Sequence, residues 1–278
     1  MPGTIREIGK SVAEDAADSA RLGGFGTSDS DHLTDPLLSD VKPTDAKAVH
    51  QKESKLDEMY STARATNEYF YETIKGVAAK TGGKVHELPV AVKALPRVKD
   101  KIGSVGDDPD VSYGGVASRV TDLVRGTIVY DTVKGCEAAL AHVELLAKKK
   151  NVKSVRGVPK KKDRFAAGGA GYKDINILIT MGNGFQCELQ LHVKAIATAK
   201  KEAGHAIYDV IRVMDKRTDL SADEARDLAE MQAFSDKVYK DAEDAAARGE
   251  DVGTDTVADW KGHPTMAMVQ AYKKQLGV

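Results

Sequence analysis

Apolar residues recur at every seventh position in the segment that follows Thr44. The series consists of Val49, Leu56, Ala63, Phe70 and Val77. This period predicts a long amphipathic helix, and Thr81-Gly82-Gly83 is a typical stop for it. A coiled coil is the alternative, but Ala63 and the nearby Asn67 in the seam favour a helix packed on its own domain.

After this helix the pattern changes to alternating strands and helices. Runs of β-branched residues predict strands at Val124–Tyr130 and Val152–Val158, with an amphipathic helix at Lys134–Lys150 between them. Two further strands are predicted at Asp174–Met181 and Phe185–Leu191, and the Asn-Gly turn that joins them makes this pair antiparallel. The expected fold is α/β of the α+β type: a mixed, partly antiparallel sheet flanked by helices, with helical extensions at both ends.

The rest of the chain is predicted to be helical. One helix is expected from about Val193 to Val213, a second begins at the capping box Ser221…Glu224, and a third covers Pro264–Leu276. These elements divide the chain into four parts. They are a flexible N-terminal arm at 1–43, a long helix and helical extension at 44–95, the α/β domain at 96–215, and C-terminal helices packed on the same domain at 216–278.

The N-terminal arm is rich in Gly, Ser, Asp and Pro, which favours a flexible segment. The alternative is an arm that docks on the body or on a partner through Leu37 and Leu38. The long helix at 44–81 also offers a surface for a partner or for a homo-oligomer.

Composition narrows the function classes. The 278 residues contain 41 Lys and Arg against 42 Asp and Glu, a balance that excludes a polycation built for non-specific nucleic-acid binding. The two cysteines are too few for a disulfide framework, and their spacing matches no zinc motif. No apolar run approaches the ~20 residues of a membrane span, and the first residues lack an apolar signal core, so we expect no membrane contact and a cytoplasmic location.

Polar residues alternate with apolar ones along the predicted strands. Gln186, Glu188 and Gln190 share one face of their strand, whereas Phe185, Cys187, Leu189 and Leu191 share the other. By the same alternation Asp174 and Asn176 point outward, as do Arg125 and Thr127. A solvated sheet face and the floor of an active site explain this pattern equally well.

Two cationic segments surround these strands. The first is a helical stripe of Lys194, Thr198, Lys201, His205, Tyr208 and Arg212. The second is the basic loop Lys160–Arg164, which leads to Tyr172, an aromatic residue suited to stacking on a nucleobase. Such charges suit a polyphosphate ligand, although a solvated charged surface is the alternative in both places.

Five short motifs together resemble the RelA/SpoT-like nucleotidyltransferase family, the alarmone synthetases. In chain order they are Arg97–Lys99, the strand after Thr121-Asp122, Lys162–Asn176 with Gly171-Tyr172, Cys187–His192, and Gly204–Tyr208. No G-x-G-x-x-G or P-loop motif occurs, so other common nucleotide-binding patterns have no support. The resemblance covers about Arg97 to Arg212, identifies a small stand-alone member and implies a nucleotidyltransferase-like sheet.

The resemblance implies an ATP-dependent pyrophosphokinase that moves the β,γ-diphosphate of ATP to a 3′-hydroxyl of a purine nucleotide. The product would be (p)ppGpp from GTP or GDP, or its adenine counterpart. In this family pattern Asp122 and Glu188 hold Mg²⁺ and serve the reaction with Gln190 and His205, and Glu188 also helps to deprotonate the hydroxyl. Tyr172 stacks on the acceptor base. Phosphate-binding roles fall to Arg97, Lys99, Arg125, Lys162, Arg164, Lys194 and Lys201.

The sequence departs from the family pattern beside these motifs. Gly171-Tyr172 is followed by Lys-Asp-Ile-Asn instead of Arg-Ser-x-His, and the Glu-x-Gln strand ends in Leu-His-Val instead of x-Arg-Thr. Two alternatives therefore stay open. One is a toxin-like enzyme that modifies the tRNA 3′-end, since seven Lys and one Arg occur between Lys148 and Lys162. The other is a catalytically silent nucleotide-binding or scaffold domain.

Overall fold

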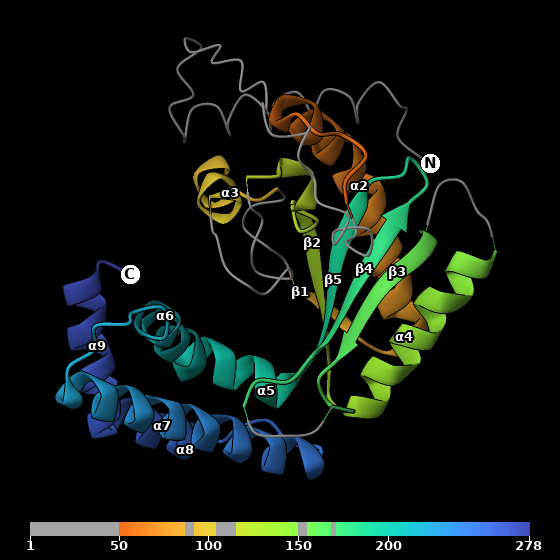
Figure 1. Ribbon diagram of the computed structural model, residues 1–278. Coiled ribbons are helices and arrows are strands. Elements are labelled where there is room, and N and C mark those ends of the chain that lie inside the picture. The colour runs from red at the N-terminus through yellow and green to blue at the C-terminus, as the bar shows by residue number, and fades with distance from the viewer. Residues whose placement is uncertain (1–49, 87–91, 104–114, 150–154, 168–170) are drawn as a thin grey trace, which may run out of the picture. The chain divides into compact units, whose positions relative to one another are not determined.

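The computed structural model describes residues 50–86, 92–103, 115–149, 155–167 and 171–278. The predicted flexible arm at 1–43 lies outside these residues. The strands are β1 (Lys84–His86), β2 (Val124–Tyr130), β3 (Val155–Asp163), β4 (Ile175–Met181) and β5 (Gln186–Val193). The helices are α2 (Leu56–Thr81), α3 (Leu95–Ile102), α4 (Val133–Lys148), α5 (Lys194–Ala199), α6 (His205–Met214), α7 (Ala222–Ala247), α8 (Thr254–Gly262) and α9 (Pro264–Leu276) (Figure 1).

The strands form one mixed sheet in the order β1-β2-β5-β4-β3. β2 and β5 are parallel, and the other neighbouring pairs are antiparallel. The β4–β5 hairpin is present as predicted: Gly184 has a φ of 92°, and Asn183 Oδ1 accepts a 3.1 Å hydrogen bond from the Phe185 N–H. The expected fold class, a mixed and partly antiparallel sheet flanked by helices, is confirmed.

Helix α2 packs against one face of the sheet. Its residues Phe70 and Ile74 are fully buried and lie against Gly126 of β2, where a Cβ atom would be 2.6 Å from Ile74 Cδ1. The helix thus packs on its own domain as predicted. It begins at Leu56 rather than near Thr44, because residues 50–55 are not helical and Gln51 bonds its side chain to the backbone of Gln186 instead.

The basic segment that was expected to form a loop is part of a strand. Lys160, Lys161 and Lys162 lie in β3 and pair with Leu178, Ile177 and Asn176 of β4. β3 is an edge strand, where lysines and a proline such as Pro159 are tolerated because one side of the backbone needs no partner strand. Periodicity alone could not show this, since the segment has no apolar alternation.

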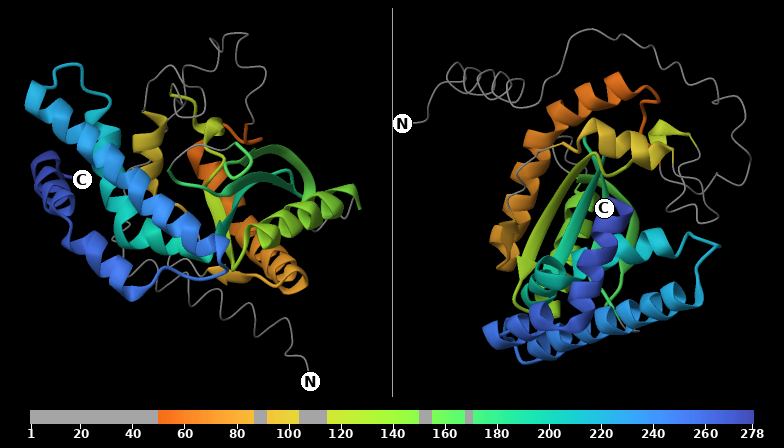
Figure 2. Two further views of the ribbon diagram at one scale, coloured as in Figure 1. Left: turned by 90° about the horizontal axis from the view of Figure 1, so that it is seen from below. Right: turned by 90° about the vertical axis from the view of Figure 1, so that its left-hand side faces the viewer.

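The C-terminal helices lie on the side of the sheet opposite α2 and α4 (Figures 1 and 2). The helix predicted at 193–213 is present, but a π-helical turn at Lys200–Gly204 separates α5 from α6. The predicted capping box at Ser221 and Glu224 opens α7, and α9 has the expected bounds; α8 was not predicted. None of the described helices combines the length and apolar character that a membrane span requires.

Candidate active site

Polar side chains line up across the sheet on the face opposite α2. The strand register pairs Arg125 with Glu188, Thr127 with Gln190, Gln190 with Asn176, and Asn176 with Lys162. Directly paired residues point to the same side of a sheet, so these side chains form one surface, called here the polar face. On the other face Cys187, Leu189 and Leu191 are fully buried, which confirms the predicted alternation.

Asp122 lies at one end of the polar face, just before β2. Lys93 forms an ion pair with Asp122 Oδ2, and Lys101 in the last turn of α3 forms another at 2.8 Å. Burial alone would raise the pKa of Asp122, but the charges and hydrogen bonds of Lys101 and Lys93 outweigh it and hold that pKa below its ordinary value. The alternative of a solvated sheet face does not hold at Asp122, since only 7% of the residue is exposed.

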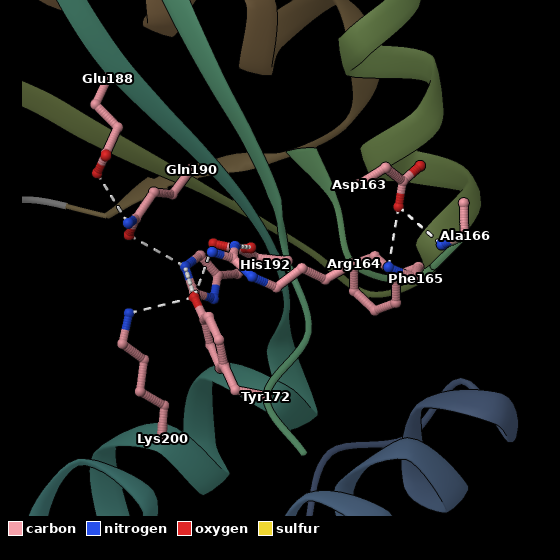
Figure 3. A network of polar contacts seen from close by, with 10 residues as sticks. Asp163, Arg164, Phe165, Ala166, Tyr172, Glu188, Gln190, His192 and Lys200 are labelled. Carbon is pink, nitrogen blue, oxygen red and sulfur yellow. Dashed lines mark hydrogen bonds and ion pairs between the residues drawn. The ribbon is translucent and has the colours of Figure 1, made fainter. Parts of the chain in front are cut away.

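Glu188 occupies the middle of the polar face. Its Oε1 accepts a 2.9 Å hydrogen bond from Gln190 Nε2 (Figure 3). Burial raises the pKa of Glu188, and the negative charge of Asp122 raises it further. The two carboxylates are therefore close enough to repel each other, as carboxylates do when they share one site.

The carboxylate pair fits a divalent cation. The buried Oδ1 of Asp122 has no hydrogen-bond partner among the described residues, although a buried carboxylate oxygen normally has one. A cation beside this oxygen would satisfy it and cancel the repulsion from Glu188. No larger cluster of His, Cys, Asp and Glu suited to a metal occurs in the described part of the chain. A hard cation such as Mg²⁺ suits two carboxylates, because it takes its other ligands from water and phosphate.

A second polar cluster lies at the opposite end of the polar face, around the Tyr172 hydroxyl (Figure 3). This hydroxyl donates a 2.9 Å hydrogen bond to Asp174 Oδ2 and lies 3.1 Å from His192 Nε2. Lys200 Nζ donates to the same hydroxyl at 3.4 Å, and Arg164 forms an ion pair with the other oxygen of Asp174. Asp174 was expected to point away from the apolar face, either into solvent or into an active site. It is 1% exposed, because Arg164 and Tyr172 cover it.

His192 connects this cluster to Glu188. Its Nε2 lies 3.4 Å from Gln190 Oε1, and Gln190 in turn donates to Glu188 (Figure 3). Burial, assisted by the charge of Lys200, lowers the pKa of His192 to about 3, so the ring is neutral. The Tyr172 hydroxyl already donates its proton to Asp174, which assigns the His192 proton to Nε2.

The structure brings several predicted site residues together. Asp122, Glu188, Gln190, Arg125 and Tyr172 all belong to the polar face or to the clusters at its ends. Arg164 joins the Tyr172 cluster, where its guanidinium carbon is 5.7 Å from the Tyr172 ring centroid. Lys162 is exposed on β3, opposite Asn176.

Other predicted residues form no hydrogen bond or ion pair with Asp122 or Glu188 in the part of the chain that the structure describes. Arg97 and Lys99 lie on the exposed side of α3. Lys194 pairs with Asp251 at 3.3 Å, Lys201 pairs with Glu202 at 3.6 Å, and His205 Nδ1 lies 3.1 Å from Asp209. Their assignment to phosphate or acceptor binding stays a prediction.

Sequence reasoning missed four residues of the site. Lys93, Lys101 and Lys200 belong to no motif, because only the folded chain brings them to the carboxylates or to Tyr172. His192 could have been predicted from the sequence. It follows Glu188 and Gln190 in strict alternation, which places it on the same face of the strand, and it replaces the arginine of the family pattern.

No family model matches this chain, and no curated protein matches its sequence. Solved structures do resemble it. The type VI effector Tas1, solved in complex with its immunity protein, is 23% identical with a TM-score of 0.45 over 66% of this chain and 96% of that chain. A GTP pyrophosphokinase family protein from Streptococcus pneumoniae is 13% identical, with a TM-score of 0.41 over 70% of this chain and 97% of that one.

The small alarmone synthetase 1 from Bacillus subtilis is 12% identical, with a TM-score of 0.39 over 80% of this chain and 100% of that chain. The chain resembles small alarmone synthetases.

Proposed function

We propose that this protein is a nucleotide pyrophosphokinase, which transfers the β,γ-diphosphate of ATP to the 3′-hydroxyl of a purine nucleotide and releases AMP. The observation that carries the proposal is the pair of neighbouring carboxylates, Asp122 and Glu188, on a face with cationic groups at both ends. Diphosphate transfer needs positioning and charge neutralisation more than covalent chemistry from the protein, and this arrangement supplies both.

Asp122 and Glu188 would hold Mg²⁺, a role supported by the unpartnered Asp122 Oδ1. When bound there, Mg²⁺ neutralises charge on the transferring phosphates. Lys93 and Lys101 hold Asp122 in place at the end that the donor triphosphate would occupy. Arg97 and Lys99 on the same helix as Lys101 are the proposed further phosphate contacts at this end.

Glu188 is the proposed base. Gln190 donates a hydrogen bond to its carboxylate and so orients it for this role. In the transfer step the acceptor 3′-oxygen forms a bond to the β-phosphorus of ATP. The bond from that phosphorus to the bridging oxygen of the α-phosphate breaks, AMP leaves, and the hydroxyl proton passes to Glu188.

The test is AMP formation from Mg-ATP, measured by chromatography with GTP, GDP, ADP, AMP or bulk tRNA as acceptor. We expect AMP only when an acceptor is present, and we expect Asp122→Asn and Glu188→Gln each to lower its rate at least about 100-fold. Matched controls are Asp131→Asn and Glu137→Gln, which neutralise exposed carboxylates elsewhere and should keep the wild-type rate.

Two outcomes would contradict the proposal. AMP formation that survives both active-site substitutions would remove the carboxylate pair from the reaction. No AMP with any acceptor would favour a binding domain without catalysis. Circular dichroism and the thermal midpoint of each variant show whether a loss of rate reflects loss of the fold, which matters because Asp122 is buried with two lysines.

A further inference from the structure

Lys200 is the first residue of the π-helical turn between α5 and α6, and its ammonium group points into the polar face (Figure 3). Its Nζ lies 3.4 Å from the Tyr172 hydroxyl and 5.0 Å from the centroid of the Tyr172 ring. The charges that act on this ammonium belong to Asp174, Glu188, Arg125 and Arg164. Lys200 therefore shares one electrostatic environment with the proposed catalytic carboxylate.

The ammonium of Lys200 differs from those of the other lysines near the site. Lys93 and Lys101 pair with Asp122, and Lys173 pairs with Glu243 at 3.0 Å. Within the part of the chain that the structure describes, Lys200 has no carboxylate within ion-pair distance, and its hydrogen bond goes to a neutral hydroxyl. A half-buried ammonium with a neutral partner retains N–H donors for an anion.

The fold holds Lys200 in this position through Tyr239 of α7. A Cβ atom at Gly204, the last residue of the π turn, would lie 2.7 Å from Tyr239 Cζ, so the Tyr239 ring fits against the turn only because residue 204 is glycine. The same ring packs edge-on against Tyr172 at 5.7 Å. α7 thus fixes both the turn that carries Lys200 and the tyrosine that Lys200 contacts.

The lysines beside Asp122 and the lysine beside Tyr172 lie at opposite ends of the polar face. Asp122, with Lys93 and Lys101, precedes β2, whereas His192 beside the Tyr172 cluster pairs with Val129 near the end of β2. Seven residues separate Asp122, which lies just outside β2, from Val129, which corresponds to at most about 23 Å of extended chain. Glu188 lies between the two ends, as a base must if it serves a reaction between two phosphate-bearing molecules.

From this arrangement we infer that Lys200 binds a phosphate group of the acceptor nucleotide and makes the enzyme selective for phosphorylated acceptors over nucleosides. The inference rests on the proposed diphosphate transfer. In the proposed function the metal end of the polar face belongs to the donor triphosphate. At the other end Arg164 is paired with Asp174, whereas Lys200 lies beside the tyrosine proposed to stack on the acceptor base and has no carboxylate partner among the described residues. Charge-assisted hydrogen bonds to phosphate are among the strong ones, so the loss of one is measurable.

The experiment compares Lys200→Met, which keeps the aliphatic stem, with Lys200→Arg, which keeps the charge. Calorimetric titrations measure the affinities for GDP, guanosine, ADP and adenosine in the presence of Mg²⁺. We expect Lys200→Met to lower the preference for the diphosphate over its nucleoside about 10- to 100-fold, and Lys200→Arg to restore most of it. Lys240→Met, an exposed α7 lysine paired with Asp244, is the control and should match wild type.

Steady-state kinetics separate this inference from the proposed function. With whichever of GDP and ADP is the better acceptor, Lys200→Met should raise the KM for that acceptor about 10- to 100-fold and change the KM for ATP little. If wild type and Lys200→Met had the same preference for the diphosphate and the same acceptor KM, the role of Lys200 would be overturned. The proposed transferase activity would not be affected by that result. Phosphate-dependent binding that needs Lys200, without AMP formation, would support the inference on Lys200 and overturn the transferase. A wild-type protein that binds none of these nucleotides would overturn both.

Discussion

The neutral, buried His192 makes the stability of the protein dependent on pH. The ring is 2% exposed, and burial together with the charge of Lys200 lowers its pKa from an ordinary value of 6.5 to about 3. In the unfolded chain His192 titrates near its ordinary value, so below that pH the unfolded state binds a proton that the folded state does not bind. The contribution to stability is therefore complete above pH 6.5 and is lost as the pH falls toward 3.

The magnitude follows from the two pKa values. Each pH unit below the unfolded pKa costs about 1.4 kcal/mol, so acidification from about pH 7 to about pH 5 removes about 2 kcal/mol of unfolding free energy through His192 alone. The assay is urea unfolding at several pH values for wild type and His192→Gln. Glutamine places an N–H close to the position of Nε2, and it does not titrate, so its curve should lack this loss of about 2 kcal/mol.

The difference between the two proteins isolates His192, because every other ionisable group is present in both. His142→Gln on α4, outside the polar face, is the matched control and should follow the wild-type curve. The same pH dependence in wild type and His192→Gln would refute the reasoning, since it would mean that His192 accepts a proton inside the folded protein.

Two further predictions concern the helices. Gly204→Ala should lower the free energy of unfolding by about 1–3 kcal/mol, because its Cβ would meet Tyr239. The control Gly76→Ala in α2 has nothing within 4 Å of its Cβ and should be neutral or stabilising. Equal thermal midpoints for the two variants would contradict this packing. Ser221→Ala should cost about 1 kcal/mol, because Ser221 Oγ accepts a 3.2 Å hydrogen bond from the Glu224 N–H. Ser221→Asp, which keeps an acceptor at this position, should lose much less in urea unfolding, and a loss as large as that of alanine would exclude the cap as the cause.

Short sequence motifs predicted correctly the turns and helix ends that depend only on neighbouring residues. The Asn-Gly turn set the direction of the β4–β5 pair, and the capping box set the start of α7. Alternation placed Glu188 and Gln190 on one face. It could not show that Asp122 and Asp174 are covered, because their partners Lys93 and Arg164 come from other segments of the chain.

The predicted cationic stripe on the helix at 193–213 does not lead to the polar face, and a π turn at Lys200–Gly204 interrupts that helix. A π turn adds one residue to a helix, so the residues after it are rotated by about 100° relative to regular α-helical spacing. Lys194, before the turn, pairs with Asp251, and the side chain of Lys201 is 82% exposed, whereas Lys200 lies on a different side of the helix and contacts Tyr172. The sequence shows no apolar irregularity at this turn that would have revealed it.

The edge position of β3 has a consequence for contacts between copies of the chain. An unpaired sheet edge is a template on which a strand of another molecule can add, and lysines and proline oppose such addition. β3 contains Pro159, Lys160, Lys161 and Lys162 along the edge that no described strand covers. The run of lysines that resembles a ligand-binding loop in the sequence thus also protects the open side of the sheet, and neutral residues there would favour edge-to-edge aggregation of the protein.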